Sequence, residues 1–240
     1  MIKKILRIFK RLIVIFFLVS VFLVMLFKFV PVPFTPLMAV RAVENMADEK
    51  ELEFSHDWVP LSEISPNLQK AVIASEDANF LAHSGFDFEA MKKAMSNNAK
   101  GKRLKGGSTI SQQTAKNVFL WQGRSYFRKA LEAYFTVLIE IIWGKERIME
   151  VYLNSIEMGT NVYGAQAAAH HWYQTTADKL SPREAAGIAA ILPNPRKFKA
   201  SNSSAFIERR KGRIVKHMQY VGPLDYSGKS GESKKEFKKK

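Results

Sequence analysis

The chain has 240 residues, 47% of them hydrophobic and 12% aromatic, which suits one folded domain with extra terminal segments and excludes a wholly disordered protein. The absence of cysteine excludes disulfides and thiolate metal sites. A formal net charge of +15 favours an anionic partner, which composition alone leaves open between nucleic acid, an anionic membrane and a phosphorylated substrate.

The first 30 residues predict a membrane anchor. Residues 12–27 contain no charged side chain, slightly fewer than the roughly 20 residues that span hydrocarbon. Lys28 can lift its ammonium to the interface, and apolar residues continue after it, so we expect a transmembrane helix over 12–30. The preceding segment, 1–11, is basic, which predicts a cytoplasmic N-terminus and an exported body. Its five cations are Lys3, Lys4, Arg7, Lys10 and Arg11.

The alternative is a cleaved signal peptide. No small-x-small cleavage pattern follows the apolar run, and Pro31 and Pro33 stand there instead, so we favour an uncleaved anchor. An exported, cation-rich body next to a bilayer has lipid phosphate or phospholipid as its anionic partner, and we expect no nucleic acid.

The rest of the chain reads as one mainly α-helical domain over 50–220. A proline-containing linker over 31–49 precedes it, and a basic tail over 221–240, expected to be disordered, follows it. Residues 100–107 are basic and rich in glycine, which predicts a mobile loop. Strand signals are few, and we find no internal repeat.

Helix-start signals locate several elements of this domain. Ser65-Pro66 and the capping box Ser181-Pro182-Arg183-Glu184 place a capping residue before a proline at the first helical position. The expected helices cover 67–80, a segment from near Ser108 through Gln113, 128–153 with a break at Gly144, and a segment from Pro182 to before Pro193.

Two segments carry residues suited to chemistry. Residues 76–85, EDANFLAHSG, bring two carboxylates, an aromatic ring and a histidine to a predicted helix end. A carboxylate beside apolar surface can act as a general base, although a solvated helix end has the same appearance. Residues 106–117, GGSTISQQTAKN, place glycines before a helix start, where backbone amides attract anions. A plain glycine turn with a helix cap is the alternative, and the nucleotide P-loop spacing is absent.

Two further segments are ambiguous when taken alone. In RKALE, Arg128 and Glu132 lie four residues apart and share a helix face, which is the usual spacing of a surface ion pair. The segment KERIMEVYLN, at 145–154, reads as an amphipathic helix, and a glycine-containing turn follows it.

Together and in this order, these segments resemble the glycosyltransferase family that polymerises peptidoglycan, a domain also found at the front of bifunctional penicillin-binding proteins. The matching segments are EDANFLAHSG, GGSTISQQTAKN, RKALE, KERIMEVYLNSIEMGTNVYG and EAAGIAAILPNP. They cover about residues 58–200. The monofunctional biosynthetic transglycosylases are the most similar group, because a chain of 240 residues has no room for a transpeptidase domain.

The resemblance implies a lysozyme-like, mainly α-helical fold with a smaller membrane-associated lobe, anchored in the cytoplasmic (inner) membrane by a single pass and acting on its outer, periplasmic face. It also implies the reaction. The donor is a growing glycan on undecaprenyl pyrophosphate, and the acceptor is the 4-hydroxyl of the GlcNAc unit of lipid II. The anomeric centre inverts, the pyrophosphate lipid leaves, and other cell-wall synthesis proteins are the expected partners.

The resemblance also implies roles for matching residues. Glu76 resembles the general base, and Glu132 resembles a second essential carboxylate that organises the donor side with cations or a divalent metal such as Mg²⁺ or Mn²⁺. No metal ligand set is assigned beyond Glu132. The expected substrate-binding residues are Asp77, Phe80, His83, Thr109, Gln113, Lys116, Asn117, Arg128, Lys145, Arg147 and Glu150.

Two positions depart from the family pattern. The run His170-His171-Trp172-Tyr173 replaces a more uniform stretch, and Gly144 stands where serine is common. Adjacent histidines point apart on a helix, so packing or exposure is the expectation rather than a metal site.

Two other functions, a glycan-cutting enzyme and a non-enzymatic scaffold, fit the sequence less well. A lysozyme-like hydrolase or lytic transglycosylase also uses a carboxylate in a helical fold, but it has no pyrophosphate for the cationic segments to bind. A non-enzymatic scaffold for cell-wall assembly has no need of both Glu76 and Glu132.

Overall fold

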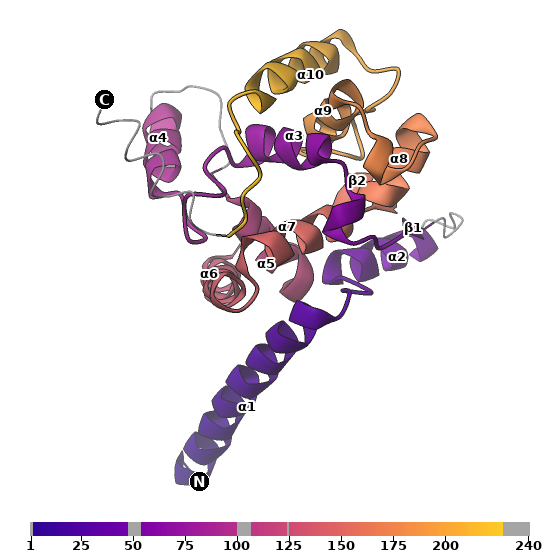
Figure 1. The fold of residues 1–240 in the computed structure, drawn as a ribbon. Helices are drawn as coiled ribbons and strands as arrows, with labels where there is room; N and C mark the ends of the chain where they lie inside the picture. The colour runs from indigo at the N-terminus through magenta and orange to yellow at the C-terminus, as the bar shows by residue number, and fades with distance from the viewer. Residues whose placement is uncertain (1, 48–53, 100–106, 124, 228–240) are drawn as a thin grey trace, which may run out of the picture.

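The structure is a computed structural model that describes residues 2–47, 54–99, 107–123 and 125–227. It is mainly helical, with one small sheet (Figure 1). The helices in chain order are α1 (Ile2–Phe29), α2 (Pro36–Ala47), α3 (Pro66–Glu76), α4 (Phe88–Ala99), α5 (Ile110–Phe119), α6 (Tyr126–Ile142), α7 (Gly144–Ser155), α8 (Ala165–Tyr173), α9 (Pro182–Ile191) and α10 (Ala205–Met218). Two short 3₁₀ helices cover Leu61–Glu63 and Ala177–Lys179.

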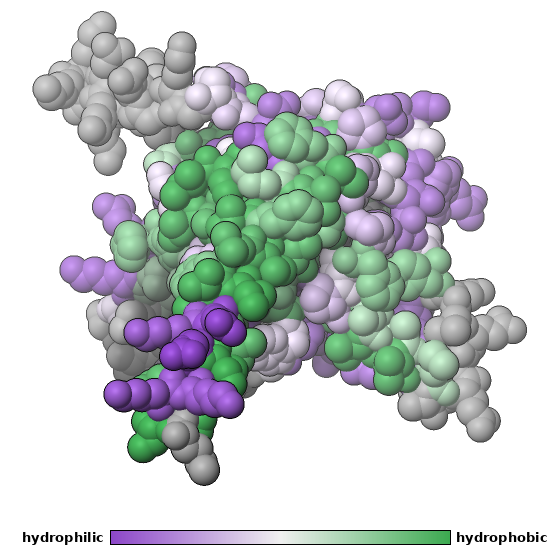
Figure 2. Space-filling view, turned by 90° about the horizontal axis from the view of Figure 1, so that it is seen from below, coloured by the Kyte–Doolittle hydropathy of each residue, from purple (hydrophilic) through white to green (hydrophobic). Residues whose placement is uncertain are grey.

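Helix α1 projects from the body and is long and apolar enough to cross a membrane (Figure 1). Its 28 residues correspond to about 42 Å of helix, more than the ~30 Å of a bilayer core. The helix begins at Ile2, so the basic segment forms its first turns ahead of the apolar run (Figure 2). Helical backbone hydrogen bonds continue through these cations because nothing before Pro31 interrupts them.

The anchor is attached to the body along its second half. The hydroxyl of Ser20 lies 2.7 Å from that of Tyr134 in α6. The indole nitrogen of Trp143 donates to the backbone carbonyl of Val24 at 2.7 Å, and the ring of Phe27 packs against that of Phe119. The orientation of the anchor relative to the body is therefore fixed by specific contacts.

The expected linker over 31–49 contains helix α2, which the sequence reading did not anticipate. The prolines at 31 and 33 precede the helix, and Pro36 occupies its first position, where a missing N–H costs nothing. Residues 48–53 and the loop residues 100–106 lie outside the described part of the chain, as does the tail from 228 onward.

Six helices of the body pack in two groups. Helices α3, α9 and α10 pack against one another, and α5 packs against α6 and α7. The two groups are seen one above the other in Figure 1. The core is formed by buried side chains from both, among them Ile73, Phe80, Ile110, Ile148 and Tyr152.

A three-stranded sheet completes the fold, in the order β1 (Ser55–His56), β3 (Val162–Tyr163), β2 (Glu157–Gly159). The first pair is parallel and the second is antiparallel with an irregular register. Its strands have two or three residues, too short for an alternating pattern to be visible in the sequence.

Several expected helix boundaries are confirmed. Ser65 caps α3, and Ser181 with Glu184 forms the capping box of α9. Gly144 separates α6 from α7 with a φ of 75°, a left-handed conformation that favours glycine.

The end of helix α3 and the C-terminal end of the domain differ from the sequence-based expectation. Helix α3 stops at Glu76 instead of continuing to Phe80, because Asp77 leaves the helical conformation. At the C-terminus, packing continues beyond residue 220: Val221, Leu224 and Tyr226 pack against the core, and the Tyr226 hydroxyl donates to Gln69 at 2.7 Å.

Candidate active site

Glu76 is the last residue of α3, and its side chain is 15% exposed. The amide of Gln113 in α5 donates to Glu76 Oε2 at 3.2 Å, and the hydroxyl of Ser75 donates to Oε1 at 3.2 Å. Two neutral donors therefore orient the carboxylate, and part of it remains accessible. This arrangement suits a group that takes a proton from a bound hydroxyl.

Behind this pair lies Tyr152, which is fully buried in α7. Its hydroxyl donates to Gln113 Oε1 at 3.3 Å. Burial, and then the charges of Glu76 and Asp77, raise the pKa of Tyr152, so the hydroxyl remains a proton donor. Because Tyr152 occupies the amide oxygen of Gln113, the amide nitrogen points to Glu76.

A cation from α10 also faces the carboxylate. Arg210 Nη2 lies 3.8 Å from Glu76 Oε1 and donates to Ser75 Oγ at 3.3 Å. Sequence reasoning missed Arg210, because it follows Glu76 by more than a hundred residues and belongs to a basic run that reads as a solvated helix face.

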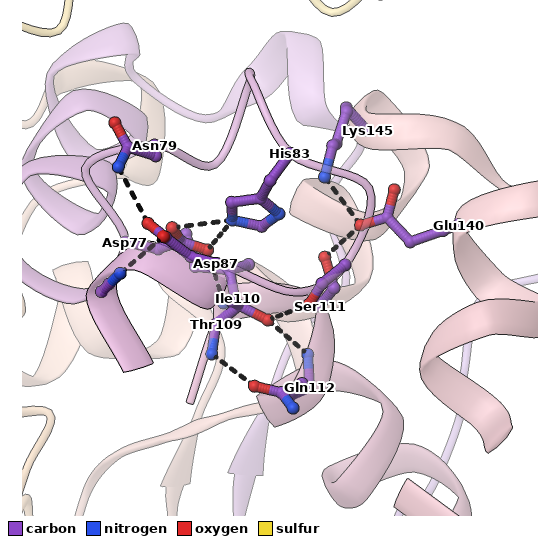
Figure 3. Close-up of polar contacts among 12 residues, drawn as sticks. Asp77, Asn79, His83, Asp87, Thr109, Ile110, Ser111, Gln112, Glu140 and Lys145 are labelled. Atoms are coloured by element: carbon purple, nitrogen blue, oxygen red, sulfur yellow. Dashed lines mark hydrogen bonds and ion pairs between the residues drawn. The ribbon is translucent and has the colours of Figure 1, made fainter. Parts of the chain in front are cut away.

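The residues after Glu76 form a loop that hydrogen bonds hold against the start of α5 (Figure 3). His83 Nε2 lies 3.0 Å from both carboxylate oxygens of Asp77, and the backbone N–H of Ile110 donates to Asp77 Oδ2 at 3.0 Å. Phe80 is fully buried. These contacts join the end of α3 to the start of α5, and the substrate contacts predicted for Asp77, Phe80 and His83 stay predictions.

Thr109 caps the N-terminus of helix α5 as one half of a capping box with Gln112. Its hydroxyl also donates to the carbonyl of Gly85 at 2.7 Å. Gly85 has a φ of 89°, and a Cβ there would lie 2.8 Å from Thr136 Cγ2, so only glycine fits this approach to α6. Thr109 and Asn117, both expected to bind substrate, are buried.

Three cations surround one carboxylate at the junction of α5 and α6. Arg128 Nη1 donates to Glu132 Oε2 at 2.8 Å, and Lys129 pairs with the other oxygen. Lys116 interacts electrostatically with the same group: burial lowers the pKa of Lys116, and the charge of Glu132 partly offsets this. Three positive charges against one negative charge leave a net local charge of +2, which suits a phosphate-bearing ligand.

Helix α5 links the carboxylate and the cations. Gln113, which donates to Glu76, and Lys116, which interacts electrostatically with Glu132, are three residues apart. That spacing places them on one helix face with about 4.5 Å of axial rise between them. The structure thus brings together the predicted Glu76, Gln113, Lys116, Arg128 and Glu132.

The described residues around Glu132 do not form a divalent-metal site. Both oxygens of Glu132 are already engaged by Arg128 and Lys129. Among the described residues, no group of three or more His, Cys, Asp or Glu side chains converges. His170 contacts Gln166, and the ring of His171 packs edge-on against Trp172.

Lys145 belongs to a second buried cluster, seen in Figure 3. Its ammonium lies 2.7 Å from Glu140 Oε1 and 4.6 Å from the centre of the Phe80 ring, and Ser111 donates to the same Glu140 oxygen at 2.5 Å. Burial lowers the pKa of Lys145, and Glu140 and then Asp77 oppose the shift. Glu140, which sequence reasoning missed, joins α5, α6 and α7.

Arg147 and Glu150 contact the anchor side of the body. Arg147 donates to the backbone carbonyls of Phe27 and Val30 and pairs with Glu150. Glu150 Oε2 also accepts a long hydrogen bond from the backbone N–H of Leu61 at 3.4 Å. These contacts hold the fold together, and the substrate role predicted for both residues stays a prediction.

Known proteins are similar to this chain over most of its length. Residues 43–219 match the family model described as Transglycosylase. A protein named biosynthetic peptidoglycan transglycosylase from Bacteroides thetaiotaomicron is 50% identical over 239 residues, covering 100% of this chain and 96% of the relative. Proteins of the same name from Bdellovibrio bacteriovorus and Caulobacter vibrioides are 53% and 54% identical, covering 85% and 80% of this chain and 81% and 82% of the relatives.

Proposed function

Because this chain belongs to the transglycosylase family and is a peptidoglycan glycosyltransferase, we propose that it polymerises lipid II into glycan strands. The proposal rests on one face of α5, where Gln113 donates to Glu76 and Lys116 interacts electrostatically with Glu132, Arg128 and Lys129. A base and an anion site one helical turn apart suit a displacement in which an alcohol attacks and a pyrophosphate leaves.

In the proposed step, the 4-hydroxyl oxygen of the lipid II GlcNAc attacks the anomeric carbon of the lipid-linked donor. A bond forms between that oxygen and the anomeric carbon, and the bond from the anomeric carbon to the pyrophosphate oxygen breaks. The electron pair leaves with the pyrophosphate, and the hydroxyl proton passes to Glu76. A single displacement inverts the anomeric centre and needs no covalent enzyme intermediate.

The cations serve the leaving group. Negative charge develops on the pyrophosphate oxygen as the bond breaks, and fixed cations stabilise it without reorganising. Lys116, Arg128 and Lys129 supply that charge, while Glu132 holds Arg128 and Lys129 in place.

The anchor accounts for access to the substrate. A substrate with a polyprenyl tail stays in the bilayer, so an enzyme fixed to the same bilayer meets it by lateral diffusion. The cations at the start of α1 favour a cytoplasmic N-terminus, and the body then acts on the outer face of the cytoplasmic membrane.

The test is polymerisation of labelled lipid II by the full chain in detergent, with the products resolved by length. Wild type is expected to give lysozyme-sensitive polymer, and Glu76→Gln to lose about 10²-fold or more of the rate with unchanged thermal unfolding. Polymer formation by Glu76→Gln at the wild-type rate would remove Glu76 as the base. Shortening of preformed glycan without synthesis would favour the lytic reaction instead.

A further inference from the structure

Ser75 lies beside the carboxylate of Glu76, and its one hydroxyl hydrogen has two hydrogen-bond acceptors within reach. The hydroxyl oxygen lies 3.2 Å from Glu76 Oε1 and 3.4 Å from the backbone carbonyl oxygen of Ala189 in α9. Arg210 Nη2 donates to the same hydroxyl oxygen at 3.3 Å. A hydroxyl has one hydrogen and two lone pairs, so Ser75 donates to one of the two oxygens at a time. Rotation about a single bond exchanges them without movement of the backbone.

The carbonyl of Ala189 is open to Ser75 because of where helix α9 ends. Ala189 belongs to the last turn of α9, which stops at Ile191. Four residues after Ala189 stands Pro193, which has no backbone N–H to donate to that carbonyl. The end of α9 therefore offers the Ser75 hydrogen an alternative to the carboxylate.

The hydrogen-bond partner of the other carboxylate oxygen has no such alternative. Gln113 donates to Glu76 Oε2, and its amide oxygen accepts from the hydroxyl of Tyr152. Turning the amide over would take this acceptor from Tyr152, which is fully buried and makes no other hydrogen bond to the described residues. An unsatisfied buried hydroxyl is costly. Gln113 therefore stays a donor to Oε2, whether Glu76 is ionised or protonated.

This difference identifies the oxygen of Glu76 that can hold a proton. A protonated carboxyl group has an O–H that needs a hydrogen-bond acceptor. At Oε2 the partner is an N–H group, which cannot accept. At Oε1, Ser75 can turn its hydrogen to the Ala189 carbonyl and accept from the carboxyl O–H, while Arg210 keeps its contact with the second lone pair of the hydroxyl. The proton on Oε1 thus leaves all of these groups satisfied.

We propose that Glu76 takes the proton on Oε1, and that Ser75 is a positioning residue whose hydroxyl reverses its hydrogen bond during the reaction. The O–H bond of the attacking sugar breaks, its proton forms an O–H bond with Oε1, and its electron pair stays on the sugar oxygen that bonds to the anomeric carbon. The Ser75 hydrogen then turns to Ala189. Release of the proton to solvent restores the starting arrangement. The inference rests on the proposed function, which requires Glu76 as the base.

The matched pair of variants is Ser75→Thr and Ser75→Val, since both side chains are β-branched and only threonine has a hydroxyl. Polymerisation of labelled lipid II by the full chain in detergent gives kcat and KM per folded molecule. Ser75→Thr is expected to retain most of kcat, and Ser75→Val to lose it about tenfold with an unchanged KM. Equal kcat of the two variants, with a lower melting temperature for Ser75→Val, would overturn the proposal in favour of a structural role.

Tyr152→Phe separates the reversing hydroxyl from an effect of Ser75 through Arg210. Without the tyrosine hydroxyl, Gln113 is free to turn its carbonyl toward a protonated Glu76 and to accept in place of Ser75. In this background, Ser75→Val is expected to lose only about threefold of kcat relative to Ser75→Thr. An equal loss in both backgrounds would overturn the proposal, because Ser75 would then act only by holding Arg210 near the carboxylate.

Glu76→Gln, measured in the same assay, separates the role of Ser75 from the role of the base. If Glu76→Gln is inactive and Ser75→Val has the kcat of Ser75→Thr, Glu76 remains the base and the role of Ser75 is overturned. If the wild type forms no polymer, polymerisation and the role of Ser75 are overturned together.

Discussion

The guanidinium of Arg147 donates two hydrogen bonds to the backbone carbonyl of Phe27, at 3.0 and 2.8 Å. Phe27 lies in the last turn of α1, where helical carbonyls have no partner within the helix. A cation is also favoured at a helix C-terminus. Arg147, in the catalytic body, therefore caps the anchor helix and fixes it to the body.

This contact predicts that Arg147→Ala destabilises the protein by about 2 kcal/mol, because carbonyl partners and the charge partner of Glu150 are lost together. Thermal unfolding of the full chain in detergent measures the effect. Arg183→Ala is the control: its pair with Glu208 is exposed, so a change within about 0.5 kcal/mol is expected. Equal effects of the two variants would contradict the capping role.

Variants of Phe80 test whether its ring packs in the core or contacts substrate. Its ring is fully buried and lies under the Lys145 ammonium. Phe80→Ala is expected to cost about 3–5 kcal/mol of stability, whereas Phe80→Leu is expected to cost less and to keep nearly normal turnover per folded molecule. Loss of turnover in a well-folded Phe80→Leu protein would instead indicate that the ring contacts substrate.

Gln113 is expected to act through Glu76. Gln113→Ala removes one donor to the carboxylate, which should lower kcat about tenfold, equivalent to roughly one hydrogen bond. The buried Tyr152 hydroxyl loses its acceptor as well, so the melting temperature should also fall, and kcat is compared per folded molecule. The exposed Gln219→Ala serves as the control for both measurements. An unchanged kcat would show that Glu76 is oriented without Gln113.

The lowered pKa of Lys116 predicts that activity falls at alkaline pH. Burial lowers its pKa below the ordinary 10.5, so the ammonium is present below the lowered pKa and is lost as pH rises through it. If this charge holds the pyrophosphate, the KM for the donor increases over that range. A guanidinium keeps its charge there, so Lys116→Arg should show a smaller rise in KM with pH. An equal rise of KM with pH in both proteins would show that a group other than Lys116 causes the alkaline loss of activity.

Local sequence patterns predict some elements of this fold and not others. The apolar run after the basic N-terminus predicted α1, and capping residues at Ser65 and Ser181 predicted the starts of α3 and α9. Helix α2 was missed because prolines around it read as a linker, and the strands of the sheet are too short to show a period.

The sequence by itself determined the mainly helical fold, the anchor and the family, since all three depend on local patterns and on motif order. Only the tertiary structure decided which motif residues lie around the candidate active site and which pack in the core or against the anchor. It placed Glu76, Gln113, Lys116 and Glu132 around one face of α5, and it turned Phe80 into the core and Arg147 onto the anchor. It also added Arg210 from α10. A motif specifies which residues occur, but the direction of each side chain follows from long-range packing between helices, which no local pattern contains.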